Sequence, residues 1–134
     1  MKAAPADPGR HYATRARETI ARLLADQRRY LSAAAVYRLL GKRKPKVSLS
    51  TVYRTLEFLV ETGIASKRID DGGETTYVTC NAVHHHHAIC SNCGRVEEIE
   101  CAPVTAIANQ LMARHSFKLN DHEMEFYGTC AACR

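Results

Sequence analysis

The sequence predicts an α+β protein with two parts. In residues 1–79, three stretches with apolar residues at helical spacing are followed by a hairpin, which is the order of elements in a winged helix-turn-helix domain. Residues 80–134 predict a small α/β domain, and they contain all six cysteines and six of the seven histidines. The division therefore separates a helical part from a part that is rich in metal ligands.

The helices of the first part follow from apolar spacing and from residues that begin or end helices. Ile20 and Leu23 share an apolar face in the first helix, and Leu56 lies on one in the third. The second helix is expected over residues 33–40. A hydroxyl can accept from the free N–H groups of a helix start, and glycine suits a helix end. The expected N-caps are Thr14, Ser32 and either Ser48 or Ser50, and the expected ends are Gly41 and Gly63.

A hairpin closes the first part. Residues 64–69 and 75–78 predict short strands, and the turn Asp70-Asp71-Gly72-Gly73 between them has the composition of hairpin turns. This hairpin is the expected wing.

Strands and one helix are expected in the second part. Residues 87–90 and 95–99 predict two strands around a CxxC turn. Pro103 suits the first position of a last helix. A final strand is expected over residues 117–127, with an irregularity at Asn120-Asp121 where the apolar alternation changes phase.

Composition limits the possible settings. The chain has 134 residues, 46% of them hydrophobic, which is enough for a core. Since no signal-peptide core or membrane-spanning stretch is visible, we expect a cytoplasmic protein with reduced thiols. Lysine and arginine outnumber acidic residues by 15 to 8 in residues 1–79, whereas acidic residues prevail by 6 to 4 in residues 80–134. The first part thus suits a polyanion and the second part a cation.

Two CxxC pairs predict a closed structural zinc site. Cys90 and Cys93 form the first pair, and Cys130 and Cys133 form the second. Four thiolates hold Zn²⁺ tetrahedrally and leave no position open for catalysis. Because the second pair follows the last strand, the metal is expected to fasten that strand within its domain and to support folding.

Four consecutive histidines precede the first CxxC pair. In an extended chain, His84 and His86 point to one face and His85 and His87 to the other, so one strand can serve two sites. The alternative is a solvated loop.

The alternation assigns the remaining ligands to two further sites. One site is expected to contain Cys80, His85, His87 and Glu98, and a possible second site His84, His86 and His122. For His122, a structural histidine is an equal alternative. Cys101 has no assigned partner and is interpreted as structural.

The third helix carries residues suited to the DNA major groove. Recognition helices need short polar residues near their start and a basic or aromatic side chain on the exposed face. Arg54 is the best candidate for a base or phosphate contact, because a guanidinium can grip guanine with two hydrogen bonds. Other helix candidates are Ser50, Thr51 and Tyr53, and phosphate contacts are expected from Arg15, Arg17, Lys42, Arg43, Lys44, Lys46, Lys67 and Arg68. A solvated basic surface is the alternative, but the order of elements favours DNA.

The chain resembles the ferric uptake regulator (Fur) family of metal-dependent bacterial transcription regulators over nearly its whole length. The resemblance rests on Ser50–Leu56, on the run HHHHAICSNCG from His84 to Gly94, and on Tyr127–Cys133. It implies an N-terminal winged-helix domain, a C-terminal α/β dimerisation domain, and a homodimeric repressor that binds palindromic operator DNA when metal is bound. It also implies that Tyr53 and Arg54 read the DNA.

Within that resemblance, two positions favour zinc. Iron- and peroxide-sensing members commonly have a histidine just before the second helix, where this chain has Tyr30, whereas zinc-sensing members commonly have a cysteine where this chain has Cys80. A thiolate also suits Zn²⁺ better than Fe²⁺ or Mn²⁺.

Two departures from the family pattern affect the ligand sets. Ser66 stands where some zinc sensors have an aspartate. Glu98, with Asp70 as second choice, must therefore complete the site of Cys80, His85 and His87, which the resemblance implies is the regulatory site. Thr105 stands where the family's second site has a glutamate.

The alternatives are an iron-, manganese- or peroxide-sensing regulator of the same family, a zinc storage protein, and a zinc enzyme. A zinc deaminase would show His-x-Glu followed by Pro-Cys-x-x-Cys, and neither motif occurs. We therefore expect no enzymatic activity and no small-molecule substrate. Zinc storage would leave the basic winged helix without a purpose.

Overall fold

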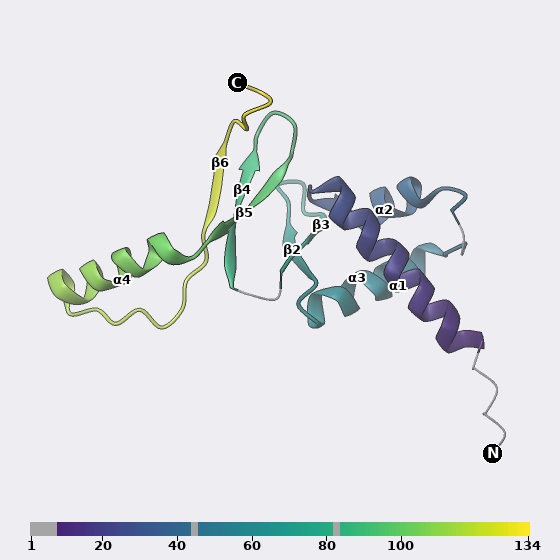
Figure 1. The fold of residues 1–134 in the computed structure, drawn as a ribbon, viewed down its shortest axis with the longest axis horizontal. Helices are drawn as coiled ribbons and strands as arrows, with labels where there is room; N and C mark the ends of the chain where they lie inside the picture. The colour runs from purple at the N-terminus through teal and green to yellow at the C-terminus, as the bar shows by residue number, and fades with distance from the viewer. Residues whose placement is uncertain (1–7, 44–45, 82–83) are drawn as a thin grey trace, which may run out of the picture. The chain divides into compact units, whose positions relative to one another are not determined.

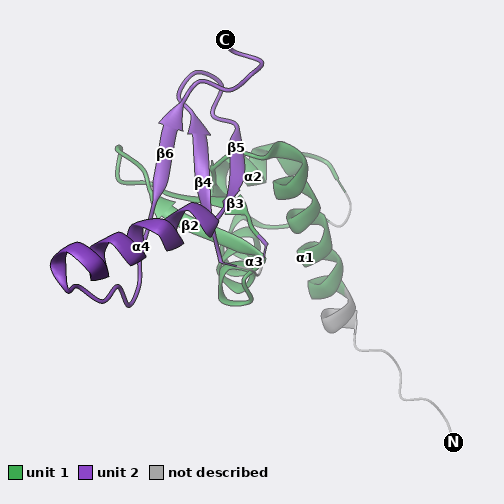
Figure 2. Ribbon diagram, turned by 60° about the vertical axis from the view of Figure 1, so that its left-hand side comes forward, with its two compact units in different colours: residues 1–80 green, residues 81–134 purple. Residues whose placement is uncertain are grey.

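A computed structural model describes residues 8–43, 46–81 and 84–134 (Figure 1). The chain forms two compact units, Met1–Cys80 and Asn81–Arg134 (Figure 2). Helices and a small sheet make up the first unit, and a sheet with one helix makes up the second, which confirms the α+β fold. Within the described ranges, no helix is long and apolar enough to cross a membrane.

The first unit contains three helices: α1 (Pro8–Gln27), α2 (Ala33–Leu40) and α3 (Leu49–Glu61). The Ser32 hydroxyl caps α2 and the Ser48 hydroxyl caps α3, each by accepting from a backbone N–H, at 3.1 Å and 3.2 Å respectively. Helix α1 begins at Pro8, earlier than the expected start after Thr14. Proline suits this position because its fixed φ is already helical and its missing N–H is not needed in the first turn.

Three antiparallel strands complete this unit in the order β1 (Leu31–Ser32), β3 (Thr75–Thr79), β2 (Ala65–Ile69). The β2–β3 hairpin is the expected wing. Its turn is held by the Asp70 carboxylate, which accepts from the N–H groups of Gly72 and Glu74, each at 2.9 Å. Strand β1 was not predicted, because two residues are too few to show an alternation.

The core of the first unit lies where the three helices meet β3. Its largest fully buried side chains are those of Ile20, Leu23, Leu24, Val36, Val52, Leu56, Leu59 and Tyr77. The apolar face of α3 is thus fixed against the other elements, whereas Tyr53 on the same helix is 46% exposed. This packing holds the polar face of α3 outward.

The second unit contains a three-stranded sheet in the order β5 (Val96–Glu100), β4 (His85–Cys90), β6 (Glu125–Gly128). Strands β4 and β5 are antiparallel, whereas β6 runs parallel to β4 and pairs Gly128 with Cys90. Both CxxC pairs therefore lie at the same end of the sheet.

Helix α4 (Ala102–His115) connects β5 to the last segment and has Pro103 in its first turn, as expected. Figure 1 shows α4 leading away from the sheet, and the chain then runs back beside α4 before it reaches β6. The prediction of a strand over residues 117–127 was wrong for 117–124, since only Glu125–Gly128 joins the sheet. Residues 117–124 are irregular chain between α4 and β6. The pairing of β4 with β6 begins only at His87 and Glu125 and ends at Cys90 and Gly128.

Candidate metal centres and nucleic-acid interface

The structure brings the four cysteines of the two CxxC pairs together. Cys90 ends β4, Cys93 lies in the following turn, and the parallel pairing of β6 with β4 places Cys130 and Cys133 beside them. All four sulfur atoms lie within 4.8 Å of one another, and the Sγ atoms of Cys93 and Cys130 are 3.7 Å apart. Sulfurs at about 2.3 Å from a tetrahedral zinc ion are about 3.8 Å apart, so the set fits Zn²⁺.

The acidities of these thiols also fit a cation. Backbone N–H groups, of Cys130 first and of Cys93 next, lower the pKa of Cys90 to about 6. The side chain of Asn92 lowers the pKa of Cys133, but the neighbouring thiols of Cys130 and Cys93 outweigh it and raise that pKa to about 11. One thiolate is thus stabilised by the backbone, while complete deprotonation of the set needs a nearby positive charge.

His85 and His87 form a second potential ligand pair. They lie on one face of β4, two residues apart, with their Nε2 atoms 3.1 Å from each other and their ring centroids 4.9 Å apart. His87 is buried. Cys80 is the last residue of the first unit, and its N–H donates to the Ile64 carbonyl at 2.8 Å.

The expected fourth regulatory ligand, Glu98, is opposite His87 in the β4–β5 ladder. Its carboxylate accepts from the backbone N–H of Asn81 at 3.0 Å and from the Asn81 side-chain amide. Glu98 does not belong to any group of ligand atoms within 4.8 Å of one another in the described part of the chain. To bind a metal ion, this carboxylate would have to give up its hydrogen bonds to Asn81.

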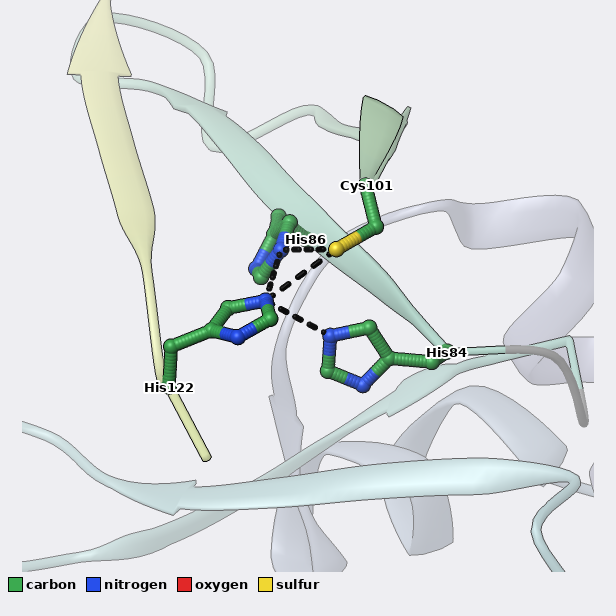
Figure 3. A group of neighbouring side chains, drawn as sticks. All are labelled: His84, His86, Cys101 and His122. Carbon is green, nitrogen blue, oxygen red and sulfur yellow. Dashed lines mark hydrogen bonds between the residues drawn. The ribbon is translucent and has the colours of Figure 1, made fainter. Parts of the chain in front are cut away.

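The second histidine set contains a residue that sequence reasoning missed. Besides His84, His86 and His122, the set includes Cys101, the N-cap residue of α4 (Figure 3). A signal was available: in the β4–β5 hairpin His85 pairs with Glu100, so the next positions outward are His84 and Cys101. Counting outward from the CxxC turn would have placed this cysteine beside the histidine run.

Burial favours the neutral form of His86. Loss of hydration is the largest cause that lowers its pKa, and the neighbouring His122 and His84 lower it further. His86 is only 4% exposed. A neutral imidazole is the form that binds metal.

The start of α3 carries an ordered set of polar side chains. Ser48 donates to the Thr51 hydroxyl at 3.0 Å, and Arg54 donates to the same hydroxyl at 3.4 Å. Ser50, Tyr53 and Arg54 are exposed, and Thr51 is partly exposed. The candidate DNA-reading residues therefore lie together on the outer face of this helix.

The expected phosphate-binding residues differ in their surroundings. Arg15 is exposed on α1, and the exposed Arg17 places its guanidinium over the Phe58 ring, 3.8 Å from the centroid. Lys67 on the wing is paired with Glu57 at 2.7 Å. Arg68 is partly exposed and stacks on Tyr30, 4.2 Å from the ring centroid. Lys42, Arg43 and Lys46 are exposed, whereas Lys44 lies outside the described residues.

A winged-helix unit with an exposed polar recognition helix, joined to a unit with thiolate and imidazole ligand sets, defines a metal-responsive DNA-binding regulator. Residues 10–127 match the ferric uptake regulator family, and the chain belongs to that family. It is therefore a metal-responsive transcription regulator and not an enzyme. Proteins of this family bind operator DNA and are typically dimers.

Named relatives include both iron and zinc regulators. The chain is 37% identical over 118 residues to the ferric uptake regulation protein of Bacillus subtilis, covering 86% of this chain and 79% of that protein. It is 35% identical over 121 residues to the zinc uptake regulation protein of Mycobacterium tuberculosis, covering 90% and 93%. A solved zinc uptake regulator in complex with zinc and DNA is 33% identical, with a TM-score of 0.64 over 88% of this chain and 80% of that one.

Proposed function

We propose that the chain is a zinc-responsive repressor that binds palindromic operator DNA as a homodimer in the cytoplasm. The choice of zinc rests on the proposed donor set Cys80, His85 and His87, in which the thiolate of Cys80 would join two imidazoles. Such a set favours Zn²⁺ over the harder ions Mn²⁺ and Fe²⁺. The chain is similarly identical to an iron and to a zinc regulator, at 37% and 35%, so the choice depends on the thiolate.

Cys80 couples the ligand set to the DNA-binding unit. Its backbone N–H is bonded to Ile64, next to the start of β2, so a ligand at this position is anchored to the wing. His85 and His87 belong to the first strand of the second unit. Ligation through Cys80 and the two histidines would restrict the connection between the units and thereby the spacing of the two recognition helices in a dimer.

Glu98 is the fourth ligand that we propose for this site. It is the cross-strand neighbour of His87, and its present partner is the exposed residue Asn81. Asp70 is the weaker choice, because its carboxylate is engaged by two N–H groups of the wing turn.

The DNA contacts divide into base-reading and positioning residues. Tyr53 and Arg54 are proposed to reach base edges, with Ser50 and Thr51 beside them at the helix start. Arg15, Arg17 and Lys67 are proposed to contact phosphates and to set the position of the domain on the duplex. Lys67 can fulfil this role because its pairing with Glu57 is exposed to solvent, where ion pairs are weak.

The second unit provides the proposed dimer surface. Five of its large apolar side chains are exposed, those of Ile107, Met112, Phe117, Phe126 and Tyr127. We propose that these side chains belong to one patch, because contiguous exposed apolar surface marks protein–protein interfaces. A second copy of the chain is the proposed occupant, since dimers are typical of the family.

Selection of DNA in different metals tests this function. Random-sequence duplexes are exposed to the full-length chain in buffered Zn²⁺, Fe²⁺ or Mn²⁺, and the retained sequences are compared. We expect a palindrome to be enriched with Zn²⁺ at the lowest free metal concentration. Enrichment with Fe²⁺ or Mn²⁺ at a lower concentration would assign another metal, and no enrichment with any metal would favour zinc storage.

A further inference from the structure

Cys101 lies beside His86 and His122 of the second set, and His84 lies on the other side of His122 (Figure 3). Its Sγ is 3.1 Å from Nε2 of His122 and 3.4 Å from Nε2 of His86. Nε2 of His122 is also 2.9 Å from that of His84 and 3.1 Å from that of His86. Four potential ligand atoms from three segments of the chain thus meet at one point.

Protons alone do not satisfy these contacts. Nε2 of a neutral imidazole either donates one hydrogen or accepts through one lone pair. Nε2 of His122 has three neighbours, His84, His86 and Cys101, so it can form a regular hydrogen bond with only one of them. A cation at the centre of the set would use one lone pair from each of the four atoms.

We propose that Cys101 is the fourth ligand of a third metal site, formed with His84, His86 and His122, and that the site takes a borderline-soft divalent ion such as Zn²⁺. This donor set differs from the one implied by the family resemblance, in which residue 105 would supply a carboxylate. The threonine at that position is exposed and is not part of the group. The proposal does not depend on the regulatory role of Cys80.

The spacing of the donor atoms agrees with a tetrahedral ion. Nitrogen ligands at about 2.0–2.1 Å from zinc are about 3.3 Å apart, and a nitrogen and a sulfur ligand are slightly farther apart. The separations between neighbouring donor atoms in this set, from 2.9 to 3.4 Å, are close to these edges. One thiolate with three imidazoles is a zinc donor set rather than a manganese set.

The environment of Cys101 favours this role. Its side chain makes no capping hydrogen bond to α4, so the sulfur is directed to the histidines instead. His86, the most buried ligand, lies within β4 and fixes the site against the sheet.

The site would restrain α4. Val104 is the buried residue of this helix, so few of its side chains hold it in place within the unit. A metal ion held by Cys101, His86 and His122 would join the start of α4 to β4 and to the segment before β6. Loading of this site would therefore order the helix that carries part of the apolar surface of the unit.

Cobalt binding tests the assignment, because a bond between Co²⁺ and a thiolate absorbs in the near ultraviolet. The full-length chain with Cys80→Ser, which retains its zinc at the four-cysteine set, is titrated with Co²⁺ while its zinc content is monitored. We expect about one equivalent of tetrahedral Co²⁺ with a thiolate band. Adding Cys101→Ser should abolish the band, whereas Cys101→His should keep cobalt bound without it.

The matched control is Thr105→Ala on the same helix, which should leave the band unchanged. Circular dichroism of every variant shows whether the unit is still folded. The proposal is overturned if Cys80→Ser protein binds no Co²⁺, or if the band persists after Cys101→Ser with the zinc content unchanged.

Discussion

The Tyr77 side chain is 1% exposed, yet its hydroxyl donates to Glu57 at 2.7 Å. We expect Tyr77→Phe to lower the free energy of unfolding by about 1 kcal/mol, because a partly buried hydrogen bond to a carboxylate is lost. Urea unfolding measures the change. Tyr53→Phe, which removes an exposed hydroxyl, is the control, and equal effects of both changes would contradict this role for Tyr77.

The contribution of Glu57 to the free energy of unfolding should depend on pH. The hydrogen bond from Lys67 first, and that from Tyr77 next, lower the pKa of this carboxyl below its usual value of 4.5. A lowered pKa stabilises the folded state above the ordinary value, and this gain is lost as the pH falls through the lowered pKa. The difference in urea midpoint between the chain and its Glu57→Gln variant should therefore be larger at pH 7 than in acid. A constant difference would disprove the coupling.

Arg54 is the residue with the largest expected effect on DNA. Its guanidinium is exposed at the start of α3 and is steadied by the Thr51 hydroxyl. We expect Arg54→Ala to weaken operator binding roughly 10- to 100-fold, the usual effect of a lost bidentate base contact. Fluorescence anisotropy with a selected operator duplex measures it. Glu61→Ala, at the far end of the same helix, should not weaken binding, and a loss as large as that of Arg54→Ala would implicate disruption of the helix rather than a lost base contact.

Individual site residues differed in how well the sequence predicted their surroundings. The CxxC spacing fixes each thiol pair locally, and the structure brings both pairs together. The partners of Cys101 depend on the register of two strands and on the return of the chain after α4. The position of Glu98 opposite His87 followed from the hairpin, but its bond to Asn81 did not. Such contacts between distant segments are absent from local patterns.

At the scale of elements, capping residues gave the most accurate boundaries. Helix α2 covers Ala33–Leu40, as predicted, because Ser32 and Gly41 mark its ends. Strand β1 and the late start of β6 could not be predicted, since both depend on pairing with a partner strand more than on the local sequence. The first turns of α1 were missed because Thr14 was expected to be its N-cap.

The cap of α3 should stabilise the recognition helix. The Ser48 hydroxyl accepts from the N–H of Thr51 at 3.2 Å. We expect Ser48→Ala to lower the free energy of unfolding by about 1 kcal/mol. Ser50→Ala, an exposed change in the first turn, should cost less than half as much. Urea denaturation compares the two, and equal costs would show that the cap is unimportant.

For the whole molecule, the four-cysteine set should decide whether the second unit folds. The buried apolar residues described in this unit are few, among them Ile89, Val96 and Val104. We expect Cys93→Ser to remove about one zinc ion per chain and to unfold the unit or dissociate the dimer, because metal binding supplies folding energy. Light scattering and zinc analysis measure both effects. A folded dimer that lacks this zinc would contradict a structural role for the set.

The central claim is that Cys80 couples zinc to DNA binding. Linkage requires zinc and operator to strengthen each other's binding by the same factor. The direct test is the operator dissociation constant of the wild-type chain and of Cys80→Ser, measured over a range of buffered free Zn²⁺. The wild-type affinity should rise with zinc, whereas the variant should keep the zinc-free affinity throughout. A variant whose affinity rises as steeply as that of the wild type would contradict the claim.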